Sequence, residues 1–478
     1  MQLIGMLDSP YVRRVAISLQ ALGPRFEHEP VPAMRAGLRT RVGWLLALAG
    51  LGALVGLAVR ALGGGDAGFL AMPAAVIAGW LVFADPRECE PGHGRGGAAP
   101  PSEAPSDRRT SLVKRIAWIA VIVVAALAAY LALWPVPIRP VAWQAPAAPG
   151  YAGAHAVNQR LAGLQMIDLG GEVGPEHVAL GPDGRLYVAV ASGNILRMAP
   201  DGAAREVFAN TGGRVLGFAF DAAGNLVAAD AVKGLLSVTS DGRVTLLADN
   251  VGGEPIRYAD AVVVAADGQI FFTDASTRFG PAGWGGTFEA SVLDIIEQSA
   301  TGRVLVFDPA TKAVRVVARG LSFANGIALA ADGQALFVAE TGRYRIWKIA
   351  ADARDLDLAA GPSAQARVLL DNLPGYPDNL MRGLDGRLWA GFTKPRSAVV
   401  DGMAGKPWLR SVTLRLPRAL WPVPPAYGHV FAFTEDGNVV ADLQDPAGTY
   451  PETTAVTETA ARLYVQSLHA KGLGWRPR

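Results

Sequence analysis

The sequence predicts an all-β fold, a six-bladed β-propeller over residues 155–478, preceded by one or more transmembrane helices. Three observations lead to this prediction: a hairpin pattern that repeats along the chain, a set of apolar segments in the first third, and the composition. The chain of 478 residues contains 56 Gly and 33 Pro, and all-β folds need many turns. Hydrophobic residues make up 51% and charged residues 18%, a balance that favours attachment to a membrane.

The repeated unit is a β-hairpin. Each copy has an apolar run, an Asp-Gly or similar tight turn, and a second apolar run, because such a turn needs a positive φ at glycine. A further copy at residues 457–468 keeps the second strand but has lost the turn glycine. The five copies that keep the turn are GPDGRLYVA (181–189), DAAGNLVAAD (221–230), AADGQIFFTD (265–274), AADGQALFVAE (330–340) and GLDGRLWAG (383–391).

A second pair of strands follows most of these hairpins, as in GNILRMAPDGAAREVF (193–208). Two hairpins make a four-stranded sheet, and five or six such sheets at a period of roughly 40–65 residues make a propeller. The last unit lacks its outer strands. We therefore expect residues 161–170 to supply an outer strand to the last blade and to close the ring.

The first residues belong to a different pattern. Residues 1–35 resemble the first strand and helix of a glutathione transferase, including the turn at Ser9, Pro10 and Tyr11. In that family such a serine can activate the thiol of glutathione. The rest of the thioredoxin-like fold is missing, so we expect no transferase activity from this fragment.

Apolar segments follow this fragment. Residues 116–134, IAWIAVIVVAALAAYLALW, carry no charge, and a spanning helix needs about 20 apolar residues. This segment predicts a transmembrane helix. Residues 43–84 contain two shorter, Gly-rich apolar stretches that could form a transmembrane hairpin. Residues 85–115 are rich in Pro, Gly and Ser and are interpreted as a linker.

Basic residues set the expected orientation. Arg108, Arg109, Lys114 and Arg115 precede the segment 116–134, and positive charge stays on the cytoplasmic side. The propeller is therefore expected to face the periplasm or the outside, as in a protein of the bacterial inner membrane.

Charge and cysteine content exclude other classes. The chain has 44 Lys and Arg against 42 Asp and Glu, a net charge of +2, which argues against a nucleic-acid surface built on gross charge. The single cysteine, Cys89, excludes an intrachain disulfide and a metal cluster built on cysteines.

Four oxygen-bearing side chains occupy equivalent places in the repeat. They lie seven residues before the turn aspartate, where the innermost strand of a blade begins at the mouth of the propeller. The other two units carry Leu216 and Thr453 there. Three carboxylates and an amide suit Ca²⁺, and Mg²⁺ or another divalent ion less well. The four predicted ligands are Glu176, Asp260, Asn325 and Asp378.

Several motifs carry a resemblance to a known family. They look like the strictosidine synthase-like branch of a larger family that includes senescence marker protein, gluconolactonases, luciferin-regenerating enzyme and the paraoxonases. The N-terminal anchor also resembles that of the adipocyte plasma membrane-associated relative. The motifs are GPEHVAL (174–180), TGRVLVFDPATKAV (301–314), GLSFANGIALAADG (320–333), VAETGRYRIWKI (338–349) and NLPGYPDN (372–379).

The resemblance implies a six-bladed propeller with calcium at its axial mouth, and ligands that match Glu176, Asn325 and Asp378. The third blade departs from the family, because Asp260-Ala261 stands where Asn followed by Asp is typical. An extra carboxylate should bind the cation more tightly and weaken it as a Lewis acid. Plant members condense an amine with an aldehyde through a Glu in the last blade, a position that Glu458 matches by alignment.

These observations favour a membrane-anchored, calcium-dependent hydrolase of lactones or aryl esters, a small-molecule enzyme in which Asp378 activates water or attacks the carbonyl. Two alternatives remain open. One is a membrane-tethered binding module without catalysis, and the other is a strictosidine synthase-like condensing enzyme that uses Glu458. Two insertions, 275–300 and 393–428, leave the mouth side of the blades and are expected to form a lid.

Overall fold

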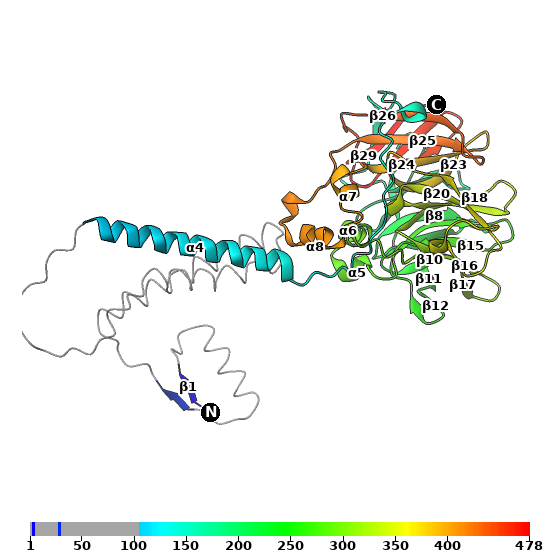
Figure 1. The fold of residues 1–478 in the computed structure, drawn as a ribbon. Helices are drawn as coiled ribbons and strands as arrows, with labels where there is room; N and C mark the ends of the chain where they lie inside the picture. Colours follow the sequence, from blue (N-terminus) through cyan, green and yellow to red (C-terminus); the bar gives the residue numbers. More distant parts are fainter. Residues whose placement is uncertain (1, 5–26, 30–104) are drawn as a thin grey trace, which may run out of the picture. The chain divides into compact units, whose positions relative to one another are not determined.

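The computed structural model describes residues 2–4, 27–29 and 105–478. The chain divides into two compact units, Met1–Trp134 with Arg415–Leu420, and Pro135–Leu414 with Trp421–Arg478. The second unit contains the propeller and is built from sheets, as Figure 1 shows.

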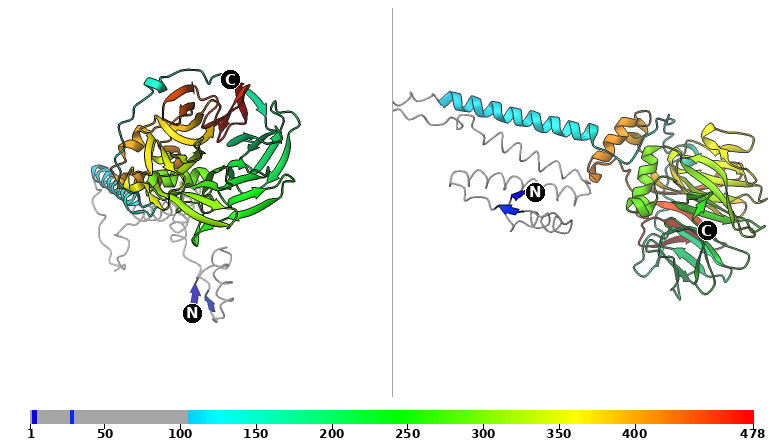
Figure 2. Two further views of the ribbon diagram at one scale, coloured as in Figure 1. Left: turned by 90° about the vertical axis from the view of Figure 1, so that its right-hand side faces the viewer. Right: turned by 90° about the horizontal axis from the view of Figure 1, so that it is seen from below.

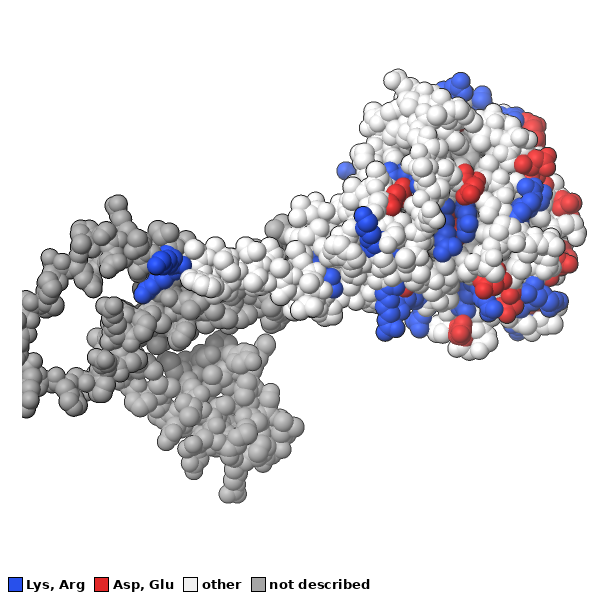
Figure 3. Space-filling model, in the orientation of Figure 1, with Lys and Arg blue, Asp and Glu red and all other residues white. Residues whose placement is uncertain are grey.

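The described part of the first unit is dominated by one helix, α4 (Pro105–Leu133), which therefore begins within the predicted linker. Strands β1 (Gln2–Ile4) and β2 (Glu27–Glu29) pair in parallel. Apolar side chains of α4 such as Trp118 and Leu133 are exposed, and the helix is drawn in white after its basic residues in Figure 3.

Among the described residues, no helix combines the length and hydropathy that crossing a membrane requires. The predicted spanning helix at 116–134 is therefore not confirmed, although this segment is helical up to residue 133. The predicted hairpin at 43–84 lies outside the described residues. So does the glutathione transferase-like fragment, apart from its two short strands.

Within the described residues, the second unit contains six four-stranded antiparallel blades, and Figure 2 (left) shows these sheets set around a central axis. A short strand, β21 (Leu356–Asp357), adds in parallel to the third blade, and β12 (Asn250–Val251) pairs with β13 (Glu254–Pro255) between the second and third. This arrangement confirms the predicted propeller.

The blades follow one another along the chain, each running from its innermost to its outermost strand. Blade one has β4 (His177–Leu180), β5 (Leu186–Ala189), β6 (Asn194–Met198) and β7 (Glu206–Asn210); blade two has β8 (Val215–Phe220), β9 (Leu226–Asp230), β10 (Gly234–Val238) and β11 (Val244–Ala248); blade three has β14 (Ala259–Val264), β15 (Ile270–Asp274), β16 (Gly302–Asp308) and β17 (Ala313–Leu321). Blade four has β18 (Ala324–Leu329), β19 (Ala335–Glu340), β20 (Arg345–Ala350) and β22 (Ala366–Leu370); blade five has β23 (Gly375–Arg382), β24 (Arg387–Pro395), β25 (Gly428–Thr434) and β26 (Val439–Asp445); blade six has β27 (Thr453–Glu458), β28 (Arg462–Ser467), β29 (Gly472–Pro477) and β3 (Gln165–Asp168).

The ring is closed by pairing the two ends of the propeller sequence. Strand β3 pairs antiparallel with β29, with Asp168 opposite Gly472. The outer strand of the last blade thus comes from residues that precede the first blade, which confirms the closure predicted for residues 161–170.

The core lies between neighbouring blades. Phe271 and Val306 of blade three pack with Val338 and Trp347 of blade four in one buried cluster. The innermost strands approach each other most closely at glycines: a Cβ on Gly326 would collide with the backbone of Asp378 and Leu380. These contacts bring the starts of the inner strands near one another at the axis.

Both insertions contain helices. The first, between β15 and β16, forms α5 (Pro281–Trp284) and α6 (Thr287–Glu297). The second, between β24 and β25, forms α7 (Ala398–Gly402), α8 (Pro407–Arg415) and the 3₁₀ turn η6 (Arg418–Leu420). The remaining 3₁₀ turns of the described residues are η3 (Gly153–His155), η4 (Thr341–Arg343) and η5 (Leu358–Ala360).

Candidate metal centre and cavity

A cavity of about 420 Å³ lies where the inner strands begin. Its floor is polar and is formed by residues of the inner strands, including the four predicted ligands. Its walls are largely apolar and come mainly from the two insertions, among them Phe288, Val292, Ile295, Leu414 and Trp421. The insertions therefore enclose the mouth, as expected for a lid.

Glu176, Asp260, Asn325 and Asp378 all line this cavity. All four are buried, with 2 to 6% of their surface exposed. Asn325 Nδ2 donates a hydrogen bond of 3.1 Å to Asp378 Oδ2, and the backbone N–H of Asn379 donates one of 3.0 Å to Asp378 Oδ1.

Local irregularities of the inner strands aim these side chains. The pairing register shifts between Ala259 and Val262 in β14, between Ala324 and Ile327 in β18, and between Pro377 and Leu380 in β23. Asp260, Asn325 and Asp378 each lie inside one of these shifts. A β-bulge redirects side chains and is common beside functional sites, so the bulges explain how separate blades point toward one place.

The three carboxyl groups repel one another in a buried setting. Burial, and then the nearby Asp378, raise the pKa of Glu176 to about 8. The same two causes raise the pKa of Asp260 well above its usual range, and burial raises the pKa of Asp378 to about 7 although Asn325 and Asn379 donate hydrogen bonds to it. A cation among these groups would favour their charged forms.

The donor set fits a hard divalent cation. It consists of oxygen atoms only, and Asn325 Oδ1 is buried without a hydrogen-bond partner among the described residues. A buried acceptor without a donor is costly, and an amide oxygen is a ligand that Ca²⁺ accepts. Glu176, Asp260, Asn325 and Asp378 are thus the residues that could hold such an ion.

Arg214 also belongs to this floor and was missed by the sequence analysis. Its Nη2 lies 3.2 Å from Glu176 Oε2, and its side chain is 12% exposed. It precedes β8 of blade two, the blade that carries Leu216 at the mouth position. The search for oxygen ligands passed over blade two for that reason.

A second charged group lies at the cavity wall. Lys394 Nζ is 2.7 Å from Glu452 Oε1, and His469 Nδ1 contacts the other carboxylate oxygen of Glu452. Although burial acts to raise it, these two partners lower the pKa of Glu452 to about 2. Glu452 has a positive φ of 55°, an unusual conformation for a residue with a side chain.

Carboxylates at the ends of the second strands support the loops around the mouth. Asp230 accepts hydrogen bonds from Thr211 Oγ1 and from the backbone N–H of Arg214. Asp274 accepts one from Tyr258 N, and Glu340 accepts one from Ser322 N. These contacts agree with a supporting role for Asp230, Asp274 and Glu340.

Glu458, predicted as a catalytic residue, is not among the residues that line this cavity. It ends β27, whereas Thr453 begins that strand at the mouth, and a strand of this length spans roughly 15 Å. Its Oε2 accepts hydrogen bonds from Leu384 N and Trp389 Nε1, and its Oε1 accepts one from Arg478 Nε. His177 is likewise outside the cavity, packed against the ring of Phe218 at 4.7 Å.

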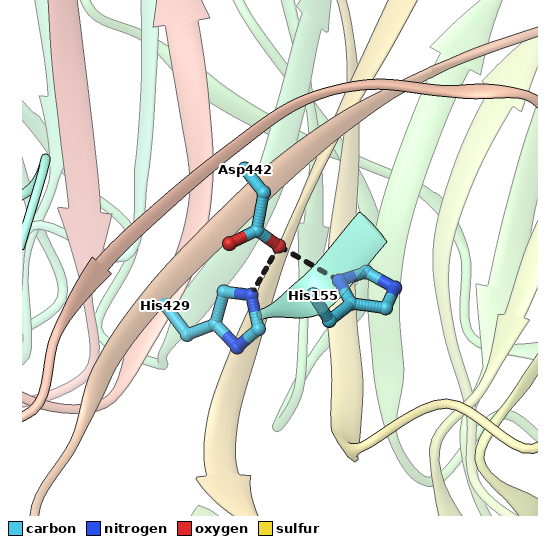
Figure 4. Close-up of side chains that lie close together, drawn as sticks. All are labelled: His155, His429 and Asp442. Atoms are coloured by element: carbon cyan, nitrogen blue, oxygen red, sulfur yellow. Dashed lines mark hydrogen bonds and ion pairs between the residues drawn. The ribbon is translucent and has the colours of Figure 1, made fainter. Parts of the chain in front are cut away.

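A separate cluster of His155, His429 and Asp442 is shown in Figure 4. Asp442 Oδ2 lies 2.7 Å from His155 Nδ1 and 2.7 Å from His429 Nε2. The other oxygen, Oδ1, accepts a hydrogen bond of 2.9 Å from Asn158 Nδ2. Each of the three side chains offers one atom that could bind a metal ion. Their hydrogen bonds attach the segment around residues 155–158 to β25 and β26 of blade five.

The insertions are tied together by one buried side chain. Arg410 of α8 donates hydrogen bonds to the backbone oxygens of Ile296 at 2.7 Å and Ala404 at 3.1 Å, and to that of Val141. Because Ile296 lies in the last turn of α6, the positive charge of Arg410 also interacts favourably with the negative end of the helix dipole.

The fold and this site define a class of protein: a six-bladed β-propeller with a polar, oxygen-rich floor at its mouth. The model of the family "Strictosidine synthase-like, N-terminal" matches residues 153–198, and that of "Strictosidine synthase" matches residues 260–353. Protein STRICTOSIDINE SYNTHASE-LIKE 6 of Arabidopsis thaliana is 32% identical over 307 residues, which cover 61% of this chain and 76% of that protein. The adipocyte plasma membrane-associated protein of Salmo salar is 30% identical over 337 residues, with 65% and 77% covered.

The chain belongs to the strictosidine synthase-like family. Among solved structures, a gluconolactonase from Xanthomonas campestris aligns with a TM-score of 0.47 at 21% identity, covering 72% of this chain and 98% of that one.

Proposed function

We propose that this protein is a calcium-dependent hydrolase of aryl esters or lactones with substantial apolar groups. The observation that carries the proposal is that Glu176, Asp260, Asn325 and Asp378 line the floor of one cavity. Apolar walls above a few polar groups are typical of small-molecule sites, and here they favour apolar substrates over sugar lactones.

A calcium ion bound by these four residues would supply Lewis-acid polarisation of the ester carbonyl. The chain itself performs the remaining tasks. The insertions exclude water around the apolar part of the substrate, which strengthens electrostatic interactions on the floor. Asp378 accepts the proton of the attacking water, since it is held in place by Asn325 and Asn379.

The test is hydrolysis by the purified full chain. A panel of aryl esters and lactones of increasing apolar size would be assayed with calcium and with a chelator. We expect turnover that requires calcium and improves with apolar size, and a loss of turnover of at least 100-fold in Asp378→Asn. Asp267→Asn, a change of equal charge at an exposed turn, serves as the control. Absence of hydrolysis across the panel at saturating calcium would overturn the proposal.

The same variant distinguishes a binding module from the proposed hydrolase. A binding module would lose stability or ligand affinity in Asp378→Asn, with no turnover to lose. The condensing reaction has less support, because Glu458 is engaged with Trp389 and Arg478 away from the cavity.

We propose further that the chain is attached to a membrane through residues 116–134, with the propeller facing the periplasm or the outside. The support is the uncharged sequence of this segment and its exposed apolar side chains such as Val124 and Leu127. The relative from Salmo salar is named for the plasma membrane. In bacterial cells, the full chain should stay in the membrane fraction after alkaline carbonate extraction, and a protease added to spheroplasts should cleave it. Release by carbonate would contradict the attachment.

A further inference from the structure

We propose that Arg214 is a working part of the centre, in which its guanidinium offsets the charge of Asp260 and presents an N–H donor to the carbonyl oxygen of the substrate. The charge-balancing half concerns the cation site, and the donor half rests on the proposed hydrolytic function. Two measurements below separate them.

The backbone places Arg214 firmly at the mouth. Its N–H donates a hydrogen bond of 3.1 Å to Asp230 Oδ1, and its carbonyl accepts one of 2.8 Å from Ala231 N. Asp230 is buried at the end of β9 and also bonds Thr211 Oγ1 at 2.7 Å. The side chain is therefore directed into the cavity from a fixed point of blade two, which contributes no oxygen ligand.

One nitrogen of the guanidinium has no partner. Nη2 contacts Glu176 Oε2 at 3.2 Å, but Nη1 is buried without a hydrogen-bond partner among the described residues. An unpaired buried donor on a charged group is expensive. A planar guanidinium also offers its donors in a fixed geometry that suits oxygen acceptors. A substrate oxygen in the cavity would satisfy Nη1.

The charges of the floor balance only if Arg214 is counted. Glu176, Asp260 and Asp378 contribute three negative charges and Arg214 one positive charge, which leaves two negative charges for a divalent cation to neutralise. The other charged pair of the lining neutralises itself, because Lys394 Nζ lies 2.7 Å from Glu452 Oε1. His469 also contacts the carboxylate of Glu452.

This balance gives a reason for the aspartate in the third blade. Arg214 lies 3.2 Å from Glu176 and lines the same buried cavity floor as Asp260. The guanidinium thus acts on both carboxylates. A simple ion pair between Arg214 and Glu176 would not require the guanidinium to compensate the charge of Asp260. It would also not require Nη1 to lack a hydrogen-bond partner.

The first measurement is calcium affinity by calorimetry on the full chain. Removing a positive charge from the floor that would hold the ion should tighten binding by about tenfold or more in Arg214→Met, and Asp260→Asn should weaken it by a similar factor. The double variant should return close to the original Kd. Arg257→Met, at an exposed position, removes the same charge away from the cavity and should change little. Unchanged or weaker binding in Arg214→Met would refute the charge balance.

The second measurement is hydrolysis of an aryl ester at saturating calcium. Arg214→Met should lower kcat/KM by about 100-fold while it tightens calcium binding, because a donor to the developing oxyanion is lost. Arg214→Lys should retain part of the rate. Equal kcat/KM in Arg214→Met would refute the donor role. If the parent chain hydrolyses nothing, the proposed function fails, whereas the calcium measurement still decides the charge balance. Circular dichroism and Tm identify any variant that fails to fold. Arg214→Gln, which also removes the charge but keeps an N–H donor, then replaces Arg214→Met, with the same effect on calcium affinity and a smaller loss of kcat/KM.

Discussion

Replacing Asp378 with asparagine should stabilise the metal-free protein at high pH, and calcium should remove part of this advantage. In the metal-free protein, burial raises the pKa of this carboxyl from 3.8 to about 7. The folded state therefore holds the proton more tightly than the unfolded state. The stabilisation from this group is fully present below about pH 4 and is lost as the pH rises through 7.

The size of the effect follows from the shift. A rise from 3.8 to about 7 corresponds to roughly 4 kcal/mol at 1.36 kcal/mol per pKa unit. Asparagine has a similar shape and no charge, so Asp378→Asn should remove this pH dependence. It should also lessen the repulsion on Glu176 and Asp260, since Asp378 raises the pKa of both.

Calcium should narrow the difference between the two proteins. A ligand at 100 times its Kd stabilises a folded protein by about 2.7 kcal/mol, and the variant lacks one charged oxygen ligand. Urea unfolding of the full chain at pH 5, 7 and 8.5, with chelator or with calcium, measures both effects. We expect the variant to be the more stable protein at pH 8.5 in chelator, and its advantage to shrink by up to about 2.7 kcal/mol in calcium. Parent protein that gains stability from pH 5 to 8.5 in chelator would refute the reasoning.

Three further perturbations test other parts of the structure. Arg410→Met should destabilise the protein by about 3 kcal/mol, because the carbonyls of Ile296 and Ala404 lose their buried donor. Limited proteolysis should then cut within the insertions, and insertions that stay intact would contradict this prediction. Gly326→Ala should cost roughly 1–3 kcal/mol by overpacking and weaken calcium binding, since the new methyl group meets the backbone of Asp378; calorimetry and Tm report both. Burial lowers the pKa of His177 to about 4, so stability present above pH 6.5 should fall by about 3 kcal/mol as the pH drops through 4, and His177→Phe should abolish this acid sensitivity in urea unfolding.

The propeller could be predicted from the sequence because its hairpin repeat is regular. In four blades the turn aspartate lies seven residues after an oxygen-bearing side chain of the innermost strand or the residue just before it, so counting back located Glu176, Asp260, Asn325 and Asp378. The bulges in β14, β18 and β23 could not be foreseen, since nothing in the local sequence distinguishes them from regular strand.

Two residues of the cavity escaped for identifiable reasons. Arg214 lies two positions before Leu216, in a blade without an oxygen ligand, and a search for oxygen donors ignores a guanidinium. Glu452 lies one position before Thr453, and its positive φ interrupts the alternation on which the counting relies. The helix α6 did leave a signal, because Phe288, Val292 and Ile295 repeat at helical spacing and line the cavity.

The closure of the ring has a consequence for biosynthesis. Strand β3 emerges from the ribosome before any blade, yet its partner β29 is translated only after blades one to five. Those blades can assemble during translation, but β3 has to wait with an unpaired edge until β29 has been made, and such edges invite association with other chains. A nonsense mutation that removes only β29 should therefore leave an open ring that aggregates, even though every residue of the cavity is present.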